Sequence, residues 1–301
     1  MSRLPLIFGT SGGVLLDDEA RFFEEAQPEG FILFARNCID TEQLKTLTRD
    51  LNAVVPNALI LIDQEGGRVM RMKPPEWPPM PPAKLYGEMY DRSPIMAGEA
   101  LKKDTAQAAL TLTDHGFNVN CVPCVDLFVP NAHAVIGDRA FHENPDVIAH
   151  LATIQARAYF DAGIRPVMKH IPGHGRASLD SHKDLPVIDA DLETLQADIA
   201  PFKALASAMG EDVWGMVCHC VYPNLDASGL PAGCSPYMVE EVIRGQIGLT
   251  GKLMSDDICM EALQVIGGPA ARAKACLDAG CDLILHCDGK LGDMREIAAS
   301  L

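Results

Sequence analysis

The segment 169–182 carries the side chains of this chain that are best suited to chemistry. It brings together three histidines, a lysine and an aspartate: Lys169, His170, His174, Asp180 and His182. Buried structure rarely tolerates so many titratable groups, because each needs a partner or must give up its charge. A carboxylate two residues before a histidine can fix the imidazole tautomer and raise its basicity. Asp180 and His182 therefore suit proton transfer near neutral pH, and the proline and glycines at 172–175 predict that they lie on a loop.

Apolar, β-rich runs alternate with helical patterns along the chain and must position these side chains. Strands are predicted at 4–8, 30–34, 58–62, 119–125, 166–170, 213–219, 252–255 and 281–286. Helices are predicted at 17–26, 41–54, 95–115, 145–162, 191–208, 236–246 and 269–278. Eight strands with intervening helices predict a single (β/α)8 TIM-type barrel over residues 1–301. The alternative is an open doubly wound sheet, which the lack of G-x-G-x-x-G after the first strand disfavours.

Ionisable side chains gather at the ends of five of the eight predicted strands. They lie at 63–68, Asp126, Lys169–His170, His219 and Asp256–Asp257. The carboxyl ends of the strands form the active face of a (β/α)8 barrel. Random placement would scatter such residues to both ends of the strands. We therefore expect a polar catalytic bowl rather than a solvated rim.

Composition limits the class of partner. The chain has a net charge of −16, which disfavours binding to nucleic-acid backbones and anionic membranes. The apolar run near the start is too short for a secretory leader, and no run approaches the length of a membrane span. We therefore expect a cytoplasmic protein.

The chain contains 10 cysteines. Cys121 and Cys124 form a C-x-x-C, and Cys218-His219-Cys220 could suggest a metal site. Both groups lie in apolar, strand-like runs, where cysteine behaves as a small hydrophobe. We expect reduced thiols in the core. His219, at the end of its run, could equally line the bowl or lie in the core.

Four segments together resemble glycoside hydrolase family 3. They are the runs at 63–69 (DQEGGRV), 136–141 (IGDRAF), 169–182 and 255–260 (SDDICM). Within that family they are similar to the single-domain β-N-acetylhexosaminidases of bacterial peptidoglycan recycling. The departures are Ile171, where the family usually has phenylalanine, and a short tail after the eighth strand.

The resemblance implies a role for each matched residue. Asp256 matches the nucleophile, His182 the acid/base, and Asp180 the residue that orients His182. Five further residues match sugar-binding positions: Asp63, Arg71, Arg139, Lys169 and His170. A carboxylate nucleophile and a proton donor suit the oxocarbenium-like transition state of glycoside hydrolysis. The usual donor is a second carboxylic acid, so a histidine in that role is unusual.

The resemblance also implies an activity and its partners. It implies a retaining exo-β-N-acetylglucosaminidase that releases terminal GlcNAc from muropeptides without a cofactor or bound metal. Two-domain β-glucosidase relatives take their acid/base from a second domain, whereas here the Asp180–His182 loop supplies one. The expected partner is a carbohydrate, with no nucleic acid or membrane, and we expect a monomer.

Other roles are open for several of these residues. Asp256 could cap a helix over 258–265, although Asp257 suits that role better. Glu65 is expected to anchor the turn at 66–67, and His174 to brace its loop. Lys169 could pair with Asp63 or Asp126 as well as bind sugar.

Two other function classes compete with the glycosidase. A metal-dependent barrel hydrolase would use His170, His174, His182 and Asp256 as ligands, but neither H-x-H after the first strand nor H-E-x-x-H is present. A sugar-binding barrel without activity would not need all three of Asp180, His182 and Asp256. Retention of hydrolysis in EDTA separates the first class from the glycosidase, and turnover itself excludes the second.

Overall fold

Eight parallel strands close into a barrel in this computed structural model, which describes residues 3–130, 134–177 and 185–301. Each strand pairs with its successor, and β8 pairs with β1. The strands are β1 (Leu4–Gly9), β2 (Pro28–Leu33), β3 (Leu59–Ile62), β4 (Val119–Asn120), β5 (Arg165–Ile171), β6 (Trp214–Val217), β7 (Leu253–Asp257) and β8 (Leu283–His286). The predicted (β/α)8 barrel is confirmed.

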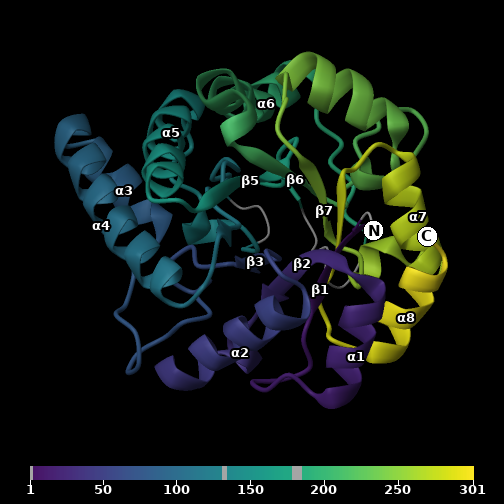
Figure 1. The fold of residues 1–301 in the computed structure, drawn as a ribbon. Helices are drawn as coiled ribbons and strands as arrows, with labels where there is room; N and C mark the ends of the chain where they lie inside the picture. The colour runs from purple at the N-terminus through teal and green to yellow at the C-terminus, as the bar shows by residue number, and fades with distance from the viewer. Residues whose placement is uncertain (1–2, 131–133, 178–184) are drawn as a thin grey trace.

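Helices surround the barrel (Figure 1). They are α1 (Asp17–Ala26), α2 (Thr41–Val54), α3 (Ala83–Tyr90), α4 (Pro94–Asp114), α5 (Pro145–Asp161), α6 (Leu192–Met209), a π-helix (Met238–Ile247), α7 (Pro269–Asp278) and α8 (Leu291–Ala299). Side-chain caps begin several of them: Asp40 accepts a hydrogen bond from the Gln43 N–H at α2, and Asp191 accepts one from Thr194 at α6. No helix among the described residues is long and apolar enough to cross a membrane.

The sequence-based prediction missed two helices, α3 and α8. In α3, Gly87 weakens the helical pattern, yet the packing requires it. A Cβ at this position would lie 1.8 Å from the carbonyl oxygen of Phe141. Close packing against the 137–142 region therefore explains a helix that the local pattern does not indicate.

The fourth strand is shorter than predicted. Regular pairing ends at Asn120, before Pro123, which has no N–H to donate to a ladder. The following residues still run beside β5, because the Val125 N–H donates to the Lys169 carbonyl over 2.7 Å. This irregular stretch brings Asp126 to the end of β5.

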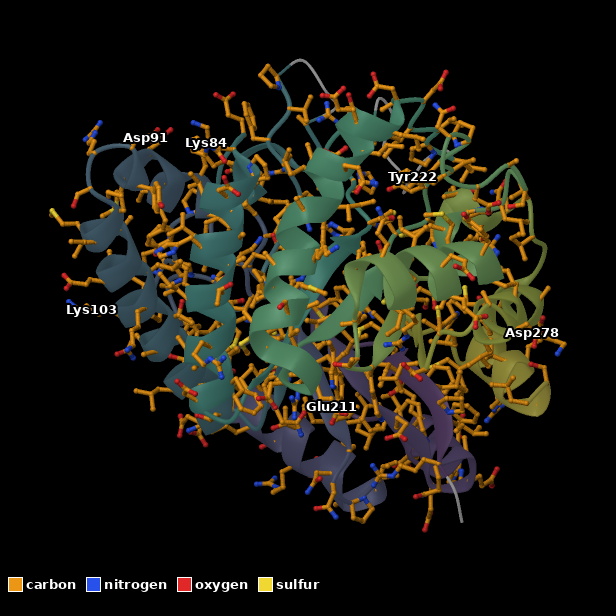
Figure 2. The ribbon with its side chains drawn as sticks, turned by 90° about the horizontal axis from the view of Figure 1, so that it is seen from above. Lys84, Asp91, Lys103, Glu211, Tyr222 and Asp278 are labelled. Carbon is orange, nitrogen blue, oxygen red and sulfur yellow. The ribbon has the colours of Figure 1, made fainter. Side chains whose placement is uncertain are left out.

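Apolar side chains from every strand fill the barrel interior. Ile7, Ile32, Leu61, Val119, Val167, Met216, Met254 and Leu283 are all buried in one cluster. Figure 2 views the barrel from the side and shows Glu211, just before β6, and Tyr222, just after it, toward opposite ends of the molecule. Because the interior is filled, polar groups that meet inside the barrel can do so only at its ends.

The cysteines are free thiols, as predicted. Eight are buried, while Cys38 and Cys259 are partly exposed. Both the C-x-x-C pair and the Cys218–Cys220 pair belong to the buried group. They act as small core residues.

Candidate active site

A cavity of about 550 Å³ opens at the carboxyl ends of the strands. Its walls include every sugar-binding residue expected from the sequence and the expected nucleophile: Asp63, Arg71, Arg139, Lys169, His170 and Asp256. Glu65, Arg68 and Asp257 also line it. These side chains come from β3, β5, β7 and the loops that follow the strands. The expected polar bowl is therefore present.

Lys169 forms the centre of a charged network in this cavity. Its side chain is 2% exposed, and its Nζ lies 2.7 Å from Asp63 Oδ1 and 2.6 Å from Glu65 Oε1. Burial by itself would lower the pKa of Lys169, but the two carboxylates outweigh burial and hold that pKa above its usual value. Lys169 therefore pairs with Asp63, as one expectation had it, and not with Asp126.

Two arginines complete the network. Arg139 binds both oxygens of Glu65 at 2.8 Å, and Arg71 donates to Asp63 Oδ2 over 2.9 Å. Burial opposes ionisation of both carboxyl groups, but the neighbouring positive charges prevail. The pKa of Glu65 falls to about 2 and that of Asp63 falls well below its usual range. Both groups are therefore carboxylates at neutral pH and can only accept hydrogen bonds.

Asp126 organises the start of the histidine-rich segment. His170 Nδ1 lies 2.6 Å from Asp126 Oδ2, and the His174 backbone N–H donates to Asp126 Oδ1 over 2.6 Å. Burial would raise the pKa of Asp126, but the charge and hydrogen bond of His170 hold it well below the usual range. Burial lowers the pKa of His174 to about 4, so its ring is neutral near pH 7. The structure is consistent with the bracing role expected for His174.

The two aspartates at the end of β7 have different surroundings. Asp257 Oδ1 accepts the backbone N–H of Cys259 over 3.0 Å and that of Cys287 over 3.1 Å. Asp257 therefore ties together the loops after β7 and β8. Asp256 accepts the N–H of Asp257 over 2.8 Å and lines the cavity. The segment 258–265 contains only a short 3₁₀-helix, Glu261–Leu263, so neither aspartate caps a helix there.

His219 lies in the core rather than in the bowl. It is fully buried, and it does not line the cavity. Neither ring nitrogen has a hydrogen-bond partner among the residues that the structure describes. Burial lowers the pKa of this histidine, which keeps the ring neutral. The sequence had left these two locations equally open.

Asp180 and His182, the expected acid/base pair, lie outside the described residues. The metal-hydrolase alternative can be compared with the remaining ligands only. Within 3–130, 134–177 and 185–301, His170, His174 and Asp256 do not bring three donor atoms within 4.8 Å of one another. His170 and His174 instead share Asp126.

Sequence reasoning underestimated two residues. Glu65 was expected only to anchor a turn, but it holds both Lys169 and Arg139. Asp126 was expected only as a strand-end acid and an alternative partner of Lys169, yet it orients His170. The spacing Asp63-x-Glu65 was an available signal, because side chains two residues apart in extended chain point to the same side.

The arrangement suits recognition of a polyhydroxylated ligand. Two ionised carboxylates present acceptors, and one ammonium and two guanidinium groups present donors, all held in place by one another. Such pre-positioned charges can bind hydroxyl and carbonyl groups with little reorganisation. Asp256 faces the same cavity from a different strand.

Comparison of the sequence with known families and proteins gives consistent matches. Residues 15–301 match the Glycosyl hydrolase family 3 N terminal domain. A Beta-hexosaminidase of Aromatoleum aromaticum is 36% identical over 287 residues, which cover 94% of this chain and 79% of that protein. A Beta-hexosaminidase of Bordetella avium is 36% identical over 286 residues, covering 94% of this chain and 80% of that protein.

Solved structures show the same architecture. NagZ from Neisseria gonorrhoeae, in complex with N-trifluoroacetyl-D-glucosamine, superposes with a TM-score of 0.90 at 33% identity, covering 99% of this chain and 85% of that one. A glycoside hydrolase family 3 β-N-acetylglucosaminidase from Paenibacillus sp. gives a TM-score of 0.89 at 28% identity, covering 99% of this chain and 56% of that one.

Proposed function

The chain belongs to glycosyl hydrolase family 3 and is a glycoside hydrolase, and we propose that it is a β-N-acetylhexosaminidase that removes terminal β-linked N-acetylglucosamine. The observation that carries this proposal is the cavity in which the Lys169–Asp63–Glu65 network and Asp256 line the same space. The names of its relatives support the same activity.

In the proposed mechanism, Asp256 attacks the anomeric carbon and forms a glycosyl ester. The bond from that carbon to the leaving oxygen breaks, and His182 in its protonated form gives the oxygen a proton. Water then loses a proton to His182 and attacks the same carbon, which releases Asp256. Two inversions leave the product with the β-configuration. Asp180 is assigned to orient the imidazole and stabilise its charged form.

The described residues of the bowl are assigned to sugar positioning. Asp63 accepts hydrogen bonds from hydroxyl groups, because its carboxyl is ionised. Lys169, Arg71 and Arg139 donate to hydroxyl and carbonyl oxygens, and His170 is held at the cavity wall by Asp126. These contacts place the anomeric carbon against Asp256, which is the contribution of proximity to the rate.

We assign muropeptides derived from peptidoglycan as the natural substrate. The support is the likeness of the four sequence segments to enzymes of peptidoglycan recycling. We also propose that the enzyme is cytoplasmic and monomeric, and that it needs neither a cofactor nor a metal for turnover.

The activity is tested with a panel of p-nitrophenyl β-glycosides of GlcNAc, GalNAc, glucose and xylose. We expect the GlcNAc substrate to be cleaved with the highest kcat/KM and the first product seen by NMR to be the β-anomer. Preference for the glucoside or xyloside would refute the substrate assignment, and an α-anomer formed first would refute double displacement.

A further inference from the structure

Three potential metal ligands converge where β7 and β8 end. They are Cys259, His286 and Asp288, and one donor atom of each lies within 4.8 Å of the other two. None of the three lines the sugar cavity. We propose that these side chains form a binding site for a divalent cation of the zinc class, separate from the catalytic machinery.

The strongest observation is an imidazole nitrogen that lacks a hydrogen bond. His286 is 1% exposed, and its Nδ1 has no hydrogen-bond partner among the described residues. A buried nitrogen left without a partner costs free energy, so such groups usually mark a bound water or ion. Within the cluster, Asp288 Oδ1 lies 3.6 Å from Nδ1. This distance is too long for a hydrogen bond.

The spacing fits a metal better than it fits a direct contact. Zinc bonds of about 2.0–2.3 Å in a tetrahedron place neighbouring ligand atoms roughly 3.3–3.8 Å apart. The distance of 3.6 Å between His286 Nδ1 and Asp288 Oδ1 matches one edge of that tetrahedron. The Cys259 Sγ lies within 4.8 Å of a donor atom of each of the other two residues, so the three side chains can reach a common ion.

Surrounding groups hold the ligands in suitable orientations. Lys290 Nζ binds Asp288 Oδ2 over 2.7 Å, and the Lys290 backbone N–H donates to Asp288 Oδ1 over 2.9 Å. On the other side of the imidazole, His286 Nε2 lies 4.0 Å from Asp293 Oδ2. With an ion bound on the Nδ1 side, this carboxylate supports the tautomer that keeps its proton on Nε2. Nδ1 then faces the cluster as an acceptor.

The ligand set selects the class of cation. A thiolate with an imidazole favours zinc over magnesium or calcium, which prefer oxygen ligands. Cys259 and Asp288 are only partly buried. The site is therefore reachable from solvent, and three protein ligands leave a fourth position for water.

A second cluster in the structure provides a contrast. Cys124, Asp126 and His170 also bring three donor atoms together. Here, however, His170 Nδ1 contacts Asp126 Oδ2 at 2.6 Å, and the Cys124 thiol donates to the same oxygen over 3.4 Å. These groups satisfy one another, so this cluster needs no ion.

The proposed site is linked to the catalytic face through Asp257. Its carboxylate accepts the N–H of Cys259, a proposed ligand, and that of Cys287, which lies between the other two ligands. Asp256 directly precedes Asp257. A cation bound across the two loops therefore stiffens the segment that holds Asp256, without taking part in the reaction.

The test is a zinc titration of the whole protein in competition with a chromophoric chelator. The variants are Cys259→Ser and His286→Gln, with Cys38→Ser as the matched control, because Cys38 is the other partly exposed cysteine. We expect wild type and Cys38→Ser to bind the same number of zinc equivalents. Each ligand variant should lose one equivalent or bind it about 100-fold more weakly, since even outer groups of metal sites contribute on that scale.

A second measurement needs no variant. Zinc should protect Cys259 from alkylation by iodoacetamide in the native protein, as read by peptide mass spectrometry, and should leave the labelling of Cys38 unchanged. If His286→Gln fails to fold, Asp288→Asn on the surface loop takes its place. Equal zinc binding by wild type and Cys259→Ser, or unprotected Cys259 at saturating zinc, would overturn the proposal. None of these readouts depends on glycosidase activity.

Discussion

Replacing Lys169 by methionine should destabilise the protein through charge rather than through shape. The two side chains have similar length, but the substitution removes the ammonium held at 2.7 Å from Asp63 and 2.6 Å from Glu65. Removing one partner of a buried ion pair costs about 3–5 kcal/mol, because the other charge remains buried. Asp63 keeps Arg71 and Glu65 keeps Arg139. We therefore expect a loss of stability at the lower end of this range, about 3 kcal/mol at pH 7.

The dependence of this loss on pH identifies its cause. In the wild type the pKa of Glu65 falls from 4.5 to about 2, so the stabilisation is full above pH 4.5 and is lost as the pH falls through 2. Without Lys169 that pKa moves back up, so the carboxyl takes up a proton in the folded variant at a higher pH. The difference in stability between wild type and Lys169→Met should therefore be largest at about pH 7 and shrink toward about pH 3.

Thermal unfolding followed by calorimetry from about pH 7 to about pH 3 measures both effects. At pH 7 we expect a fall in Tm of about 5 °C for Lys169→Met, because a loss of about 3 kcal/mol is divided by the unfolding entropy of a 301-residue chain. The control is Lys103→Met on α4, where the lysine is exposed (Figure 2) and the change in Tm should be small. A loss under about 1 kcal/mol at pH 7, or an equal loss at every pH, would refute the charge argument.

The remaining predictions concern the catalytic groups and the histidine network. Asp256→Asn should lower kcat by at least about 10³-fold. A 5-fluoro GlcNAc mimic should label the peptide at Asp256, and labelling at Asp257 would contradict the assignment of Asp256 as the nucleophile. His182→Ala should form the glycosyl-enzyme from a dinitrophenyl glycoside at a nearly normal rate but should cleave alkyl glycosides about 10²–10⁴-fold more slowly. Asp180→Asn should show the same pattern with smaller losses. Equal losses for all leaving groups would show that His182 only positions the sugar. His174, whose pKa is about 4 in the fold against the ordinary histidine value of 6.5, binds its proton more readily when unfolded. The free energy of unfolding of the wild type should therefore fall by about 3 kcal/mol as the pH falls from about 6.5 to about 4. Urea unfolding of His174→Gln should show a smaller fall over the same interval, because the variant lacks this imidazole.

Much of the fold could be predicted from local patterns. A strand buried on both faces is a short apolar run, and the side chain that ends it is read directly from the sequence. The eight strands and their polar carboxyl ends were therefore predictable, and so was the gathering of Asp63, Lys169 and Asp256 at one face. Departures occurred where a distant segment changes the local preference, as when Phe141 leaves room for only a glycine in α3.

The partner of each charge was decided by tertiary structure. Lys169 had Asp63 and Asp126 as alternatives in sequence, and the barrel places it against Asp63 and Glu65 while Asp126 binds His170. The partners are separated by 106 residues for Lys169 and Asp63, and by 44 for His170 and Asp126. The energy of an ion pair depends on the distance between its charges and on how far both are removed from water. Neither quantity exists until the strands close into a barrel, so the sequence determined which charges reach the bowl and the structure determined how they pair.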